Sequence, residues 1–316
     1  MNISQVCVLG GSGFVGSAIV AQLSAAGYAV KVLTRRREDA KHLILLPGVQ
    51  VEECDVFFDA ALNRALAGSD AVINLIGILH ESRKSGFDKV HRELPQRVAQ
   101  ACVAQGVPRL LQMSALQAAP DAPSAYLRSK AAGEAAVKQA AGDAVRVTLF
   151  RPSVIFGRGD SFLNLFASLV RLLPVLLLAK PDARFQPVYV EDVARAFVAS
   201  LACPETAGQT YSLCGPEVFT LRQLVQHVAG KLGKQRCIIG LNDRLSYLQA
   251  WAMELLPVKL MTRDNFYSMQ RDSVCDCPFP AVFGFQPTPL EAVSSQYLND
   301  GTPRSVYLRY RTLSGR

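Results

Sequence analysis

Tyr126 and Lys130 lie four residues apart, a spacing that puts both side chains on one face of a helix. An ammonium beside a phenol lowers the free energy of the phenolate, which would let Tyr126 donate or accept a proton near neutral pH. Ser114, which follows an apolar strand-like run, would polarise a substrate carbonyl through its hydroxyl. These three side chains predict hydride transfer to or from a carbonyl carbon. The alternative is an exposed tyrosine–lysine pair on a surface helix.

A glycine-rich turn near the start of the chain has the spacing of a diphosphate-binding loop. Gly10, Gly13 and Gly16 follow the apolar run 5–9, and a helical segment begins directly behind them. Glycine permits the sharp turn, the close approach of backbone to a pyrophosphate, and the packing of helix on strand. The first amides of the helix then face the phosphates. A purely structural turn is the alternative. The expected binding residues are Gly10, Ser12, Gly13, Phe14, Val15 and Gly16.

The end of the second strand-like run indicates which dinucleotide binds. Folds that prefer NAD commonly hold the ribose hydroxyls with an acidic residue about 20 positions beyond the glycine turn. This chain has Arg35, Arg36 and Arg37 in that region instead. Guanidinium groups bind phosphate through paired hydrogen bonds, which favours the 2′-phosphate of NADP(H) over NAD(H). A solvated basic loop is the alternative interpretation.

Residues at the ends of three further strand-like runs are expected to line the same ligand. Those after the third run would meet the adenine, and those after the fourth would lie beside the nicotinamide ribose. One more expected cofactor-binding residue, Met113, precedes Ser114 at the end of the fifth run. The predicted positions are Asp55, Val56, Leu75, Ile76, Gly77 and Met113.

The elements that must position these residues alternate along the first half of the chain. Short β-branched runs cover residues 5–9, 29–33, 49–53, 71–76, 110–113 and 145–150, and helical segments cover 13–25, 59–66, 90–105 and 125–140. Continuously apolar strands that alternate with helices are typical of a parallel sheet buried on both faces. Because the crossovers are right-handed, the sheet is doubly wound. The sequence therefore predicts an α/β protein with a Rossmann-like fold.

Beyond Arg151 the alternation weakens. A strand at 187–190, a helix at 191–201 and a strand at 210–213 are expected to return to the main sheet. The dinucleotide-binding domain is thus predicted to comprise residues 1–150 together with 187–215. Residues 151–186 and 216–316 would form a smaller C-terminal α/β lobe over the carboxyl ends of the strands, where open α/β sheets bind ligands.

The composition indicates a globular protein. Of the 316 residues, 50% are hydrophobic and 19% are charged, with a formal net charge of +8. The longest apolar stretch, 172–179, contains Pro174 and is far shorter than the ~20 residues of a membrane span. The first residues lack the basic region of a signal peptide. We therefore expect no transmembrane segment and a cytoplasmic location.

The cysteines and histidines suggest neither a disulfide framework nor a metal site. The eight cysteines are scattered, and Cys275 and Cys277, the one close pair, have neither zinc nor thioredoxin spacing. We predict reduced core thiols. The four histidines, including His91, show no ligand spacing, and no metal is expected.

Several motifs resemble those of the extended short-chain dehydrogenase/reductases. The motifs occur in order along most of the chain: the glycine turn, Asp55-Val56, Ser114, Tyr126-x-x-x-Lys130, Arg151-Pro152 and the segment VYVEDV at 188–193. Residues 124–134, 156–164 and 211–216 are similar to one atypical branch, which contains the NADPH-binding accessory subunit of respiratory complex I and its bacterial relatives.

The resemblance implies a fold and a cofactor more firmly than a reaction. It implies that Arg151, Pro152 and Val154, with residues 156–160, close over the nicotinamide or substrate, and that Asp192 caps or orients the returning helix. It also implies a tightly held nucleotide with a structural role. Around Ser114 this chain departs from the family pattern, with a single hydroxyl where active members often have a run of serine or threonine.

Two classes of function therefore remain open. One is an NADP(H)-binding accessory or oxidoreductase-type protein linked to complex I or quinone metabolism. The other is an epimerase, dehydratase or reductase acting on a nucleotide sugar or another small carbonyl compound.

Surface chemistry bears on the choice of partner. The apolar stretches 172–179 and 245–260 would suit an isoprenoid, a quinone or a respiratory membrane partner, although such stretches can also be core. A basic tail from Arg304 would suit the anionic inner face of a membrane, where the protein would be peripheral. Nucleic acid is not expected, since the arginines line no recognisable reading element.

Overall fold

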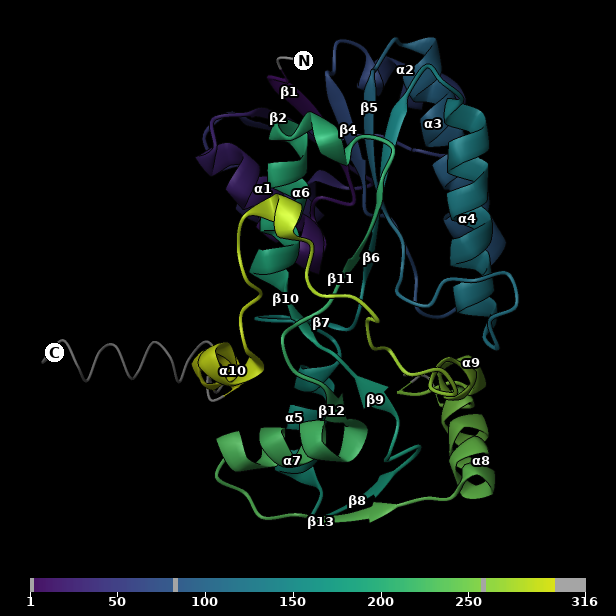
Figure 1. The fold of residues 1–316 in the computed structure, drawn as a ribbon, viewed down its shortest axis with the longest axis vertical. Coiled ribbons are helices and arrows are strands. Elements are labelled where there is room, and N and C mark those ends of the chain that lie inside the picture. Colours follow the sequence, from purple (N-terminus) through teal and green to yellow (C-terminus); the bar gives the residue numbers. More distant parts are fainter. Residues whose placement is uncertain (1–2, 82–84, 257–259, 299–316) are drawn as a thin grey trace, which may run out of the picture.

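Seven short strands form one parallel sheet in the computed structural model, which describes residues 3–81, 85–256 and 260–298 (Figure 1). The strand order is β11-β6-β5-β4-β1-β2-β3, and every pairing is parallel. The order reverses between β1 and β4, which creates the crevice where doubly wound sheets bind ligands. The strands are β1 (Gln5–Leu9), β2 (Ala29–Thr34), β3 (Val49–Glu53), β4 (Ala71–Asn74), β5 (Arg109–Met113), β6 (Arg146–Pro152) and β11 (Thr210–Leu213).

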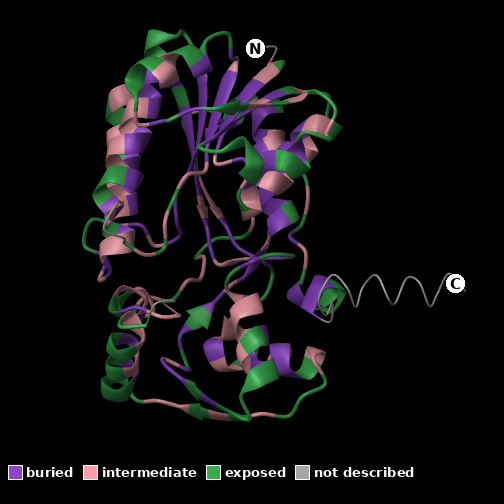
Figure 2. Cartoon of the chain, turned by 180° about the vertical axis from the view of Figure 1, so that it is seen from behind, coloured by how far each residue is buried: buried purple, intermediate pink, exposed green. Residues whose placement is uncertain are grey.

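Helices cover both faces of this sheet, as the predicted fold requires. One apolar core lies between the sheet and α1 (Phe14–Ala25) with α6 (Val190–Ala202). A second lies under α2 (Asp59–Leu66), α3 (Leu94–Ala104) and α4 (Ala125–Ala141). The 3-10 turn η1 (Arg37–Leu43) joins β2 to β3. Figure 2 shows the strands largely buried between the two helical layers.

The helix predicted at 90–105 is divided into two parts. A π-helical turn, η2 (Lys89–Glu93), precedes α3. Pro95 has no N–H, so it cannot donate the α-helical hydrogen bond to the carbonyl of His91. A Cβ on Gly133 of α4 would overlap that same carbonyl oxygen, so η2 and α4 cross with backbone in contact with backbone.

The smaller lobe has its own core, formed mainly by α5 (Leu163–Leu172) and α7 (Leu221–Lys231) (Figure 1). Two short ribbons, β8 (Val175–Leu178) with β13 (Cys237–Gly240) and β9 (Arg184–Phe185) with β12 (Phe219–Thr220), border it. The remaining elements are η3 (Pro204–Thr206), α8 (Asp243–Glu254), α9 (Arg263–Ser268), η4 (Ala281–Phe283) and α10 (Leu290–Leu298).

One of the two strands expected to return to the sheet does so. β11 joins the sheet beside β6, whereas β10 (Val188–Tyr189) pairs with β7 (Ile155–Phe156) in a separate ribbon. β10 is short because α6 begins at Val190. The prediction that residues 187–190 return to the main sheet is therefore wrong.

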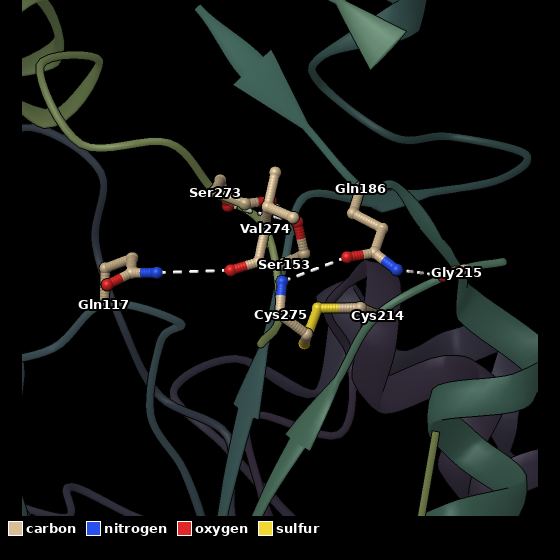
Figure 3. The surroundings of a disulfide bond; sticks show 8 residues. All are labelled: Gln117, Ser153, Gln186, Cys214, Gly215, Ser273, Val274 and Cys275. Carbon is tan, nitrogen blue, oxygen red and sulfur yellow. Dashed lines mark hydrogen bonds between the residues drawn. A yellow bond between two sulfur atoms is a disulfide. The ribbon is translucent and has the colours of Figure 1, made fainter. Parts of the chain in front are cut away.

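The prediction that all cysteines are reduced is also wrong. Cys214 and Cys275 form a disulfide with their Cα atoms 6.2 Å apart (Figure 3). The two residues are 61 positions apart, and only the folding of the smaller lobe brings them together. Cys7, Cys54 and Cys102 are buried free thiols, as expected.

No helix in the described part of the chain has the length and apolarity needed to cross a membrane. The stretch expected at 245–260 forms α8 and the turn after it, while residues 257–259 and the basic tail from Arg304 lie outside the described residues.

Candidate functional site

The glycine turn between β1 and α1 is held by contacts between backbone atoms. Gly10 has φ +79°, and the Gly13 N–H donates to the Gly10 carbonyl at 3.1 Å. A Cβ on Gly16 would overlap the carbonyl oxygen of Gly10. No side chain caps α1 at Gly13, and no acidic residue lies in its first turn. The turn, with Ser12, Phe14 and Val15 at the helix start, therefore fits the diphosphate of a dinucleotide.

The ends of β1 and β4 form the crevice beside this turn. The backbone of Leu75 and Ile76 lies 3.3 Å from where a Cβ on Gly10 would sit. The N–H of Ile76 donates to Asn74 Oδ1 at 3.2 Å, which fixes the chain just past β4. Asp55 Oδ1 accepts the Phe57 N–H at 3.0 Å and so orders the turn after β3, with Val56 buried beneath it.

The three arginines after β2 are exposed, but they are not equivalent. Arg36 is paired with Asp39, Nη2 to Oδ1, at 3.1 Å. The backbone N–H of Arg37 donates to Glu53 Oε1 at 2.7 Å. Arg35 directly follows Thr34, the last residue of β2, and is the arginine nearest the strand end. Asp39 thus competes with a phosphate for Arg36, a partner that the sequence prediction did not include.

Helix α4 brings Tyr126 and Lys130 to the same site, with Ser124 as its N-cap accepting the Leu127 N–H at 3.2 Å. Lys130 Nζ lies 5.9 Å from the centre of the Tyr126 ring. It also lies 3.1 Å from where a Cβ on Gly77 would sit, so Gly77 leaves room for the amine. Tyr126, Lys130 and the end of β4 therefore lie together.

The electrostatics of this pair differ from the prediction. Burial, followed by the charge of Asp264, raises the pKa of Tyr126 to about 12. Burial lowers the pKa of Lys130 to about 8, although the charge of Glu134 opposes that shift. In this arrangement Lys130 does not bring the phenol pKa toward neutrality, because desolvation disfavours the charged form of both groups.

Ser114 is held by a carboxylate that the sequence analysis did not single out. Its hydroxyl donates to Glu134 Oε1 at 2.5 Å, and Arg151 Nε donates to the same oxygen at 2.8 Å. Arg151 Nη2 also pairs with Glu134 Oε2. Since the hydroxyl proton of Ser114 points to Glu134, it is not directed at a substrate carbonyl. Glu134 lies four residues beyond Lys130 on α4, and that spacing could have revealed it.

His91 is a second buried residue that the sequence analysis left as an isolated histidine. Its Nε2 accepts the Ile78 N–H at 3.0 Å, and its Nδ1 lies 2.8 Å from Ser129 Oγ. Its ring is 5.4 Å from that of Tyr126, edge to face. The π-helical turn η2 carries His91 to this position, which no residue spacing along the chain indicates.

The strand ends on the other side of the site come from β5 and β6. Met113 ends β5 and is buried; Arg151 and Pro152 end β6, and Val154 follows half-buried. A Cβ on Gly157 would lie 3.5 Å from the Phe14 ring, so the loop 156–160 reaches the glycine turn. Asp160 orders the loop by accepting the N–H groups of Gly157 and Leu163 at 3.1 and 2.6 Å.

Asp192 has a different role from the one expected. It lies in the first turn of α6 but accepts the Thr288 N–H at 2.6 Å and the Thr288 hydroxyl at 3.1 Å. It therefore fastens the segment before α10 to α6 and does not cap its own helix.

Comparisons with known proteins agree with this geometry. Residues 6–214 match the model of the NAD dependent epimerase/dehydratase family. The chain is 33% identical, over 302 residues, to the mouse protein named NADH dehydrogenase [ubiquinone] 1 alpha subcomplex subunit 9, mitochondrial; the match covers 92% of this chain and 78% of that protein. It is 31% identical, over 240 residues, to a ceramide reductase of Caulobacter vibrioides, covering 75% of this chain and 74% of the other.

Among solved structures, an NADPH-dependent quinone oxidoreductase of Escherichia coli in complex with NADPH has a TM-score of 0.76. The two chains are 19% identical, and the match covers 93% of this chain and 100% of the oxidoreductase chain. At this identity the likeness is one of fold. The family model matches well over half of the chain, including the glycine turn, Tyr126 and Lys130. The chain is therefore a nicotinamide-dinucleotide-binding protein of the short-chain dehydrogenase/reductase type, and it belongs to the NAD dependent epimerase/dehydratase family.

Proposed function

We propose that the chain is an NADP(H)-binding accessory protein of a respiratory, quinone-handling membrane system, in which the nucleotide is retained as a structural ligand. The observation that carries this proposal is the site chemistry: the pKa of Tyr126 is raised to about 12 and the Ser114 proton is held by Glu134. Such a site is poorly set for proton transfer at neutral pH, which favours a nucleotide that is held without turnover. The mouse relative, named as a subunit of an NADH dehydrogenase, supports the respiratory assignment.

The preference for NADP(H) is tested by the nucleotide that the purified protein carries and by titration. We expect mass spectrometry to detect released NADP(H). Arg35→Ala should weaken NADPH binding about tenfold, the equivalent of one lost charge-assisted contact, and leave NADH binding unchanged. Arg64→Ala, which removes an exposed arginine of α2, is the matched control and should bind NADPH like the parent. Release of NAD(H) alone, or of a nucleotide sugar, would overturn the preference.

A second candidate function is turnover of a carbonyl substrate, either a nucleotide sugar or another small carbonyl compound. The observation in its favour is the lowered pKa of Lys130, about 8, on the same helix face as Tyr126. A bound nicotinamide dinucleotide would donate or accept the hydride, and Tyr126 would transfer the proton. If this function holds, Tyr126→Phe abolishes turnover in a carbonyl panel and leaves nucleotide affinity unchanged. A parent protein that binds NADPH and is inactive with the whole panel favours the accessory role.

We also propose that the smaller lobe binds the anionic inner face of a membrane. Exposed apolar side chains gather on β8, β13 and α8, where Leu177 pairs in register with Ile239 and its carbonyl accepts a hydrogen bond from Gln249 of α8 at 2.9 Å. Figure 2 shows α8 as largely exposed. The exposed set is Val175, Leu177, Ile239, Leu245, Leu248, Trp251, Leu255 and Leu256. Exposed apolar surface of this kind, with a basic tail in the sequence, suits an anionic bilayer.

Cosedimentation with vesicles tests the membrane proposal. The protein should bind vesicles containing phosphatidylglycerol more strongly than vesicles of phosphatidylcholine alone. Leu248→Ser together with Trp251→Ser should abolish that binding without unfolding the chain, because both side chains are exposed. Leu45→Ser, at an exposed leucine of the other lobe, is the control. Equal binding by the double variant and the parent would contradict the proposal.

A further inference from the structure

We propose that the Cys214–Cys275 disulfide is a thiol-sensitive latch, which holds residues 262–275 against the start of α4, where Tyr126 lies, and against the loop after β5. Residues 262–275 form the strap. The latch concerns the site proposed above, but its chemistry does not depend on what that site binds.

The disulfide lies at the carboxyl end of the main sheet. Cys214 directly follows β11, and Cys275 lies in the strap after α9 (Figure 3). Gln186 bridges the two: its Oε1 accepts the Cys275 N–H at 2.9 Å, and its Nε2 donates to the Gly215 carbonyl at 2.7 Å. The bond therefore fastens the end of the strap to the sheet edge that faces the smaller lobe.

The strap also contacts the elements that carry the site residues. Asp264 accepts the backbone N–H groups of Ala125 and Tyr126 at 2.7 and 3.0 Å, so a residue of the strap caps the start of α4. Near its other end, the Val274 carbonyl accepts a hydrogen bond from Gln117 at 3.2 Å. Gln117 lies three residues beyond Ser114. The strap thus spans the start of α4 and the loop after β5.

The other polar contacts of the strap are non-covalent. The Ser273 N–H donates to the Arg184 carbonyl at 2.8 Å, and the Ser273 carbonyl accepts the Gln186 N–H at 3.0 Å. Arg271 pairs with Asp121 at 2.8 Å, but the Asp121 side chain is 78% exposed and the pair is screened by solvent. Ser153 donates to the Ser273 carbonyl at 2.8 Å. Hydrogen bonds that exchange with water contribute modestly, whereas the disulfide is covalent. Opening the disulfide therefore leaves the strap held by contacts that can break and re-form.

The disulfide is reducible by an external dithiol. Cys275 is half-buried while Cys214 is 3% exposed, so we expect a reagent to reach the bond from the Cys275 side and to attack the Cys275 sulfur. A thiolate of the dithiol attacks that sulfur, breaks the protein S–S bond and forms a mixed disulfide, and Cys214 leaves as a thiolate that takes up a proton. The second thiol of the reagent then displaces Cys275. The protein gains two thiols, and the dithiol becomes a disulfide.

Hydrogen exchange at the start of α4 tests the latch without reference to any nucleotide. In the oxidised full-length protein the amides of Ala125 and Tyr126 should be protected by Asp264. Dithiothreitol should raise their exchange rates at least about tenfold, because the cap is lost whenever the strap moves away. Reoxidation should restore the protection. Alkylation after denaturation should find two more thiols in the reduced sample than in the oxidised one.

Cysteine variants separate the latch from general effects of reductant. Cys275→Ser should show fast exchange with or without dithiothreitol. Cys277→Ser, two residues away, and Cys237→Ser, on β13, each remove an exposed free cysteine and should respond to dithiothreitol like the parent. If Cys275→Ser does not fold, reduction and reoxidation of the parent still decide the question.

Two outcomes would overturn the latch. One is the alkylation of all eight cysteines without reductant, after equilibration with oxidised glutathione. The other is protection of Ala125 and Tyr126 that does not change on reduction. Titration with NADPH tests the proposed function separately. A chain that does not bind NADPH but exchanges faster in dithiothreitol refutes the proposed function and supports the latch. A chain that binds NADPH but whose exchange is unchanged by dithiothreitol refutes the latch alone.

Discussion

One face of α4 carries three titratable groups that share an environment largely shielded from solvent. Tyr126, Lys130 and Glu134 follow one another at intervals of four residues. Burial keeps the phenol protonated and makes the ammonium easier to deprotonate. Glu134 meanwhile accepts hydrogen bonds from Ser114 and Arg151. A proton transfer at this site would therefore need a charge or hydrogen bond that stabilises the phenolate, which a bound dinucleotide or substrate would have to supply.

His91 makes folding stability depend on pH below neutrality. Burial, followed by the charge of Lys130, lowers the pKa of His91 to about 3, and Ile78 already donates to Nε2. The unfolded chain binds this proton near pH 6.5 and the folded chain does not, so stability is present above pH 6.5 and is lost as the pH falls toward 3. Between pH 8 and pH 5 we expect a loss of about 2 kcal/mol from this group.

Urea unfolding at pH 5, 6 and 8 measures the effect as a difference between variants. His91→Gln should remove this part of the pH dependence, since glutamine does not titrate. His42→Gln, at an exposed histidine, should keep it. The same slope in His91→Gln and the parent would show that folding does not lower the pKa of His91.

At the scale of elements, the crossing of η2 and α4 determines where Lys130 and His91 lie. The crossing is close because Gly133 has no side chain to separate the two backbones. Neighbouring residues of α4 then contact η2 directly: Ser129 meets His91 Nδ1 at 2.8 Å and donates to the Tyr126 carbonyl at 2.7 Å. The position of the site residues thus depends on the packing distance between two helices.

Replacing Gly133 by alanine tests this dependence. The new methyl group would overlap the His91 carbonyl, and overpacking of this kind costs typically 1–3 kcal/mol or more. Gly230→Ala in α7 is the matched control: nothing lies within 4 Å of its Cβ position, so it should be neutral or stabilise by up to about 1 kcal/mol. Thermal and urea unfolding of both variants give the comparison, and equal stability for both would contradict the close crossing.

The sequence predicts correctly those elements whose hydrophobic pattern or turn residues lie within the element itself. The strands 5–9, 49–53 and 210–213 and the helix 59–66 have the predicted bounds, because their hydrophobic patterns are contained in their own residues. The glycine turn was recognisable for the same reason. The π-helical turn was not, since it depends on Pro95 together with Gly133 from another helix. Asp264 meets the Tyr126 N–H from 138 residues away, and Cys275 meets Cys214 across 61 residues, so no spacing along the chain indicates these contacts.

The two lobes of the molecule are joined by several passes of the chain and by one disulfide. The bond closes a loop of 61 residues that contains α7, β13, α8 and α9 of the smaller lobe. In the chain-entropy description, a loop of this length restricts the unfolded chain enough to stabilise the fold by about 4 kcal/mol. The same bond that latches the strap is thus expected to contribute a large part of global stability.

Reduction should accordingly lower the urea midpoint of the parent. We expect a loss of about 4 kcal/mol with dithiothreitol, or in Cys214→Ser together with Cys275→Ser, through freedom gained by the unfolded chain. Cys237→Ser should be as stable as the parent in the absence of reductant. A midpoint that does not move on reduction would show that the bond is not formed in solution.

The position of β11 has a consequence for how the protein emerges from the ribosome. β6 ends at Pro152, whereas β11, which completes the same sheet, begins at Thr210. The intervening residues belong largely to the smaller lobe, so the outer edge of β6 stays open until they have been synthesised. An uncovered strand edge invites pairing with other chains. Nascent or truncated forms that stop between these two strands should aggregate, and those that extend past Leu213 should be the first to stay dispersed.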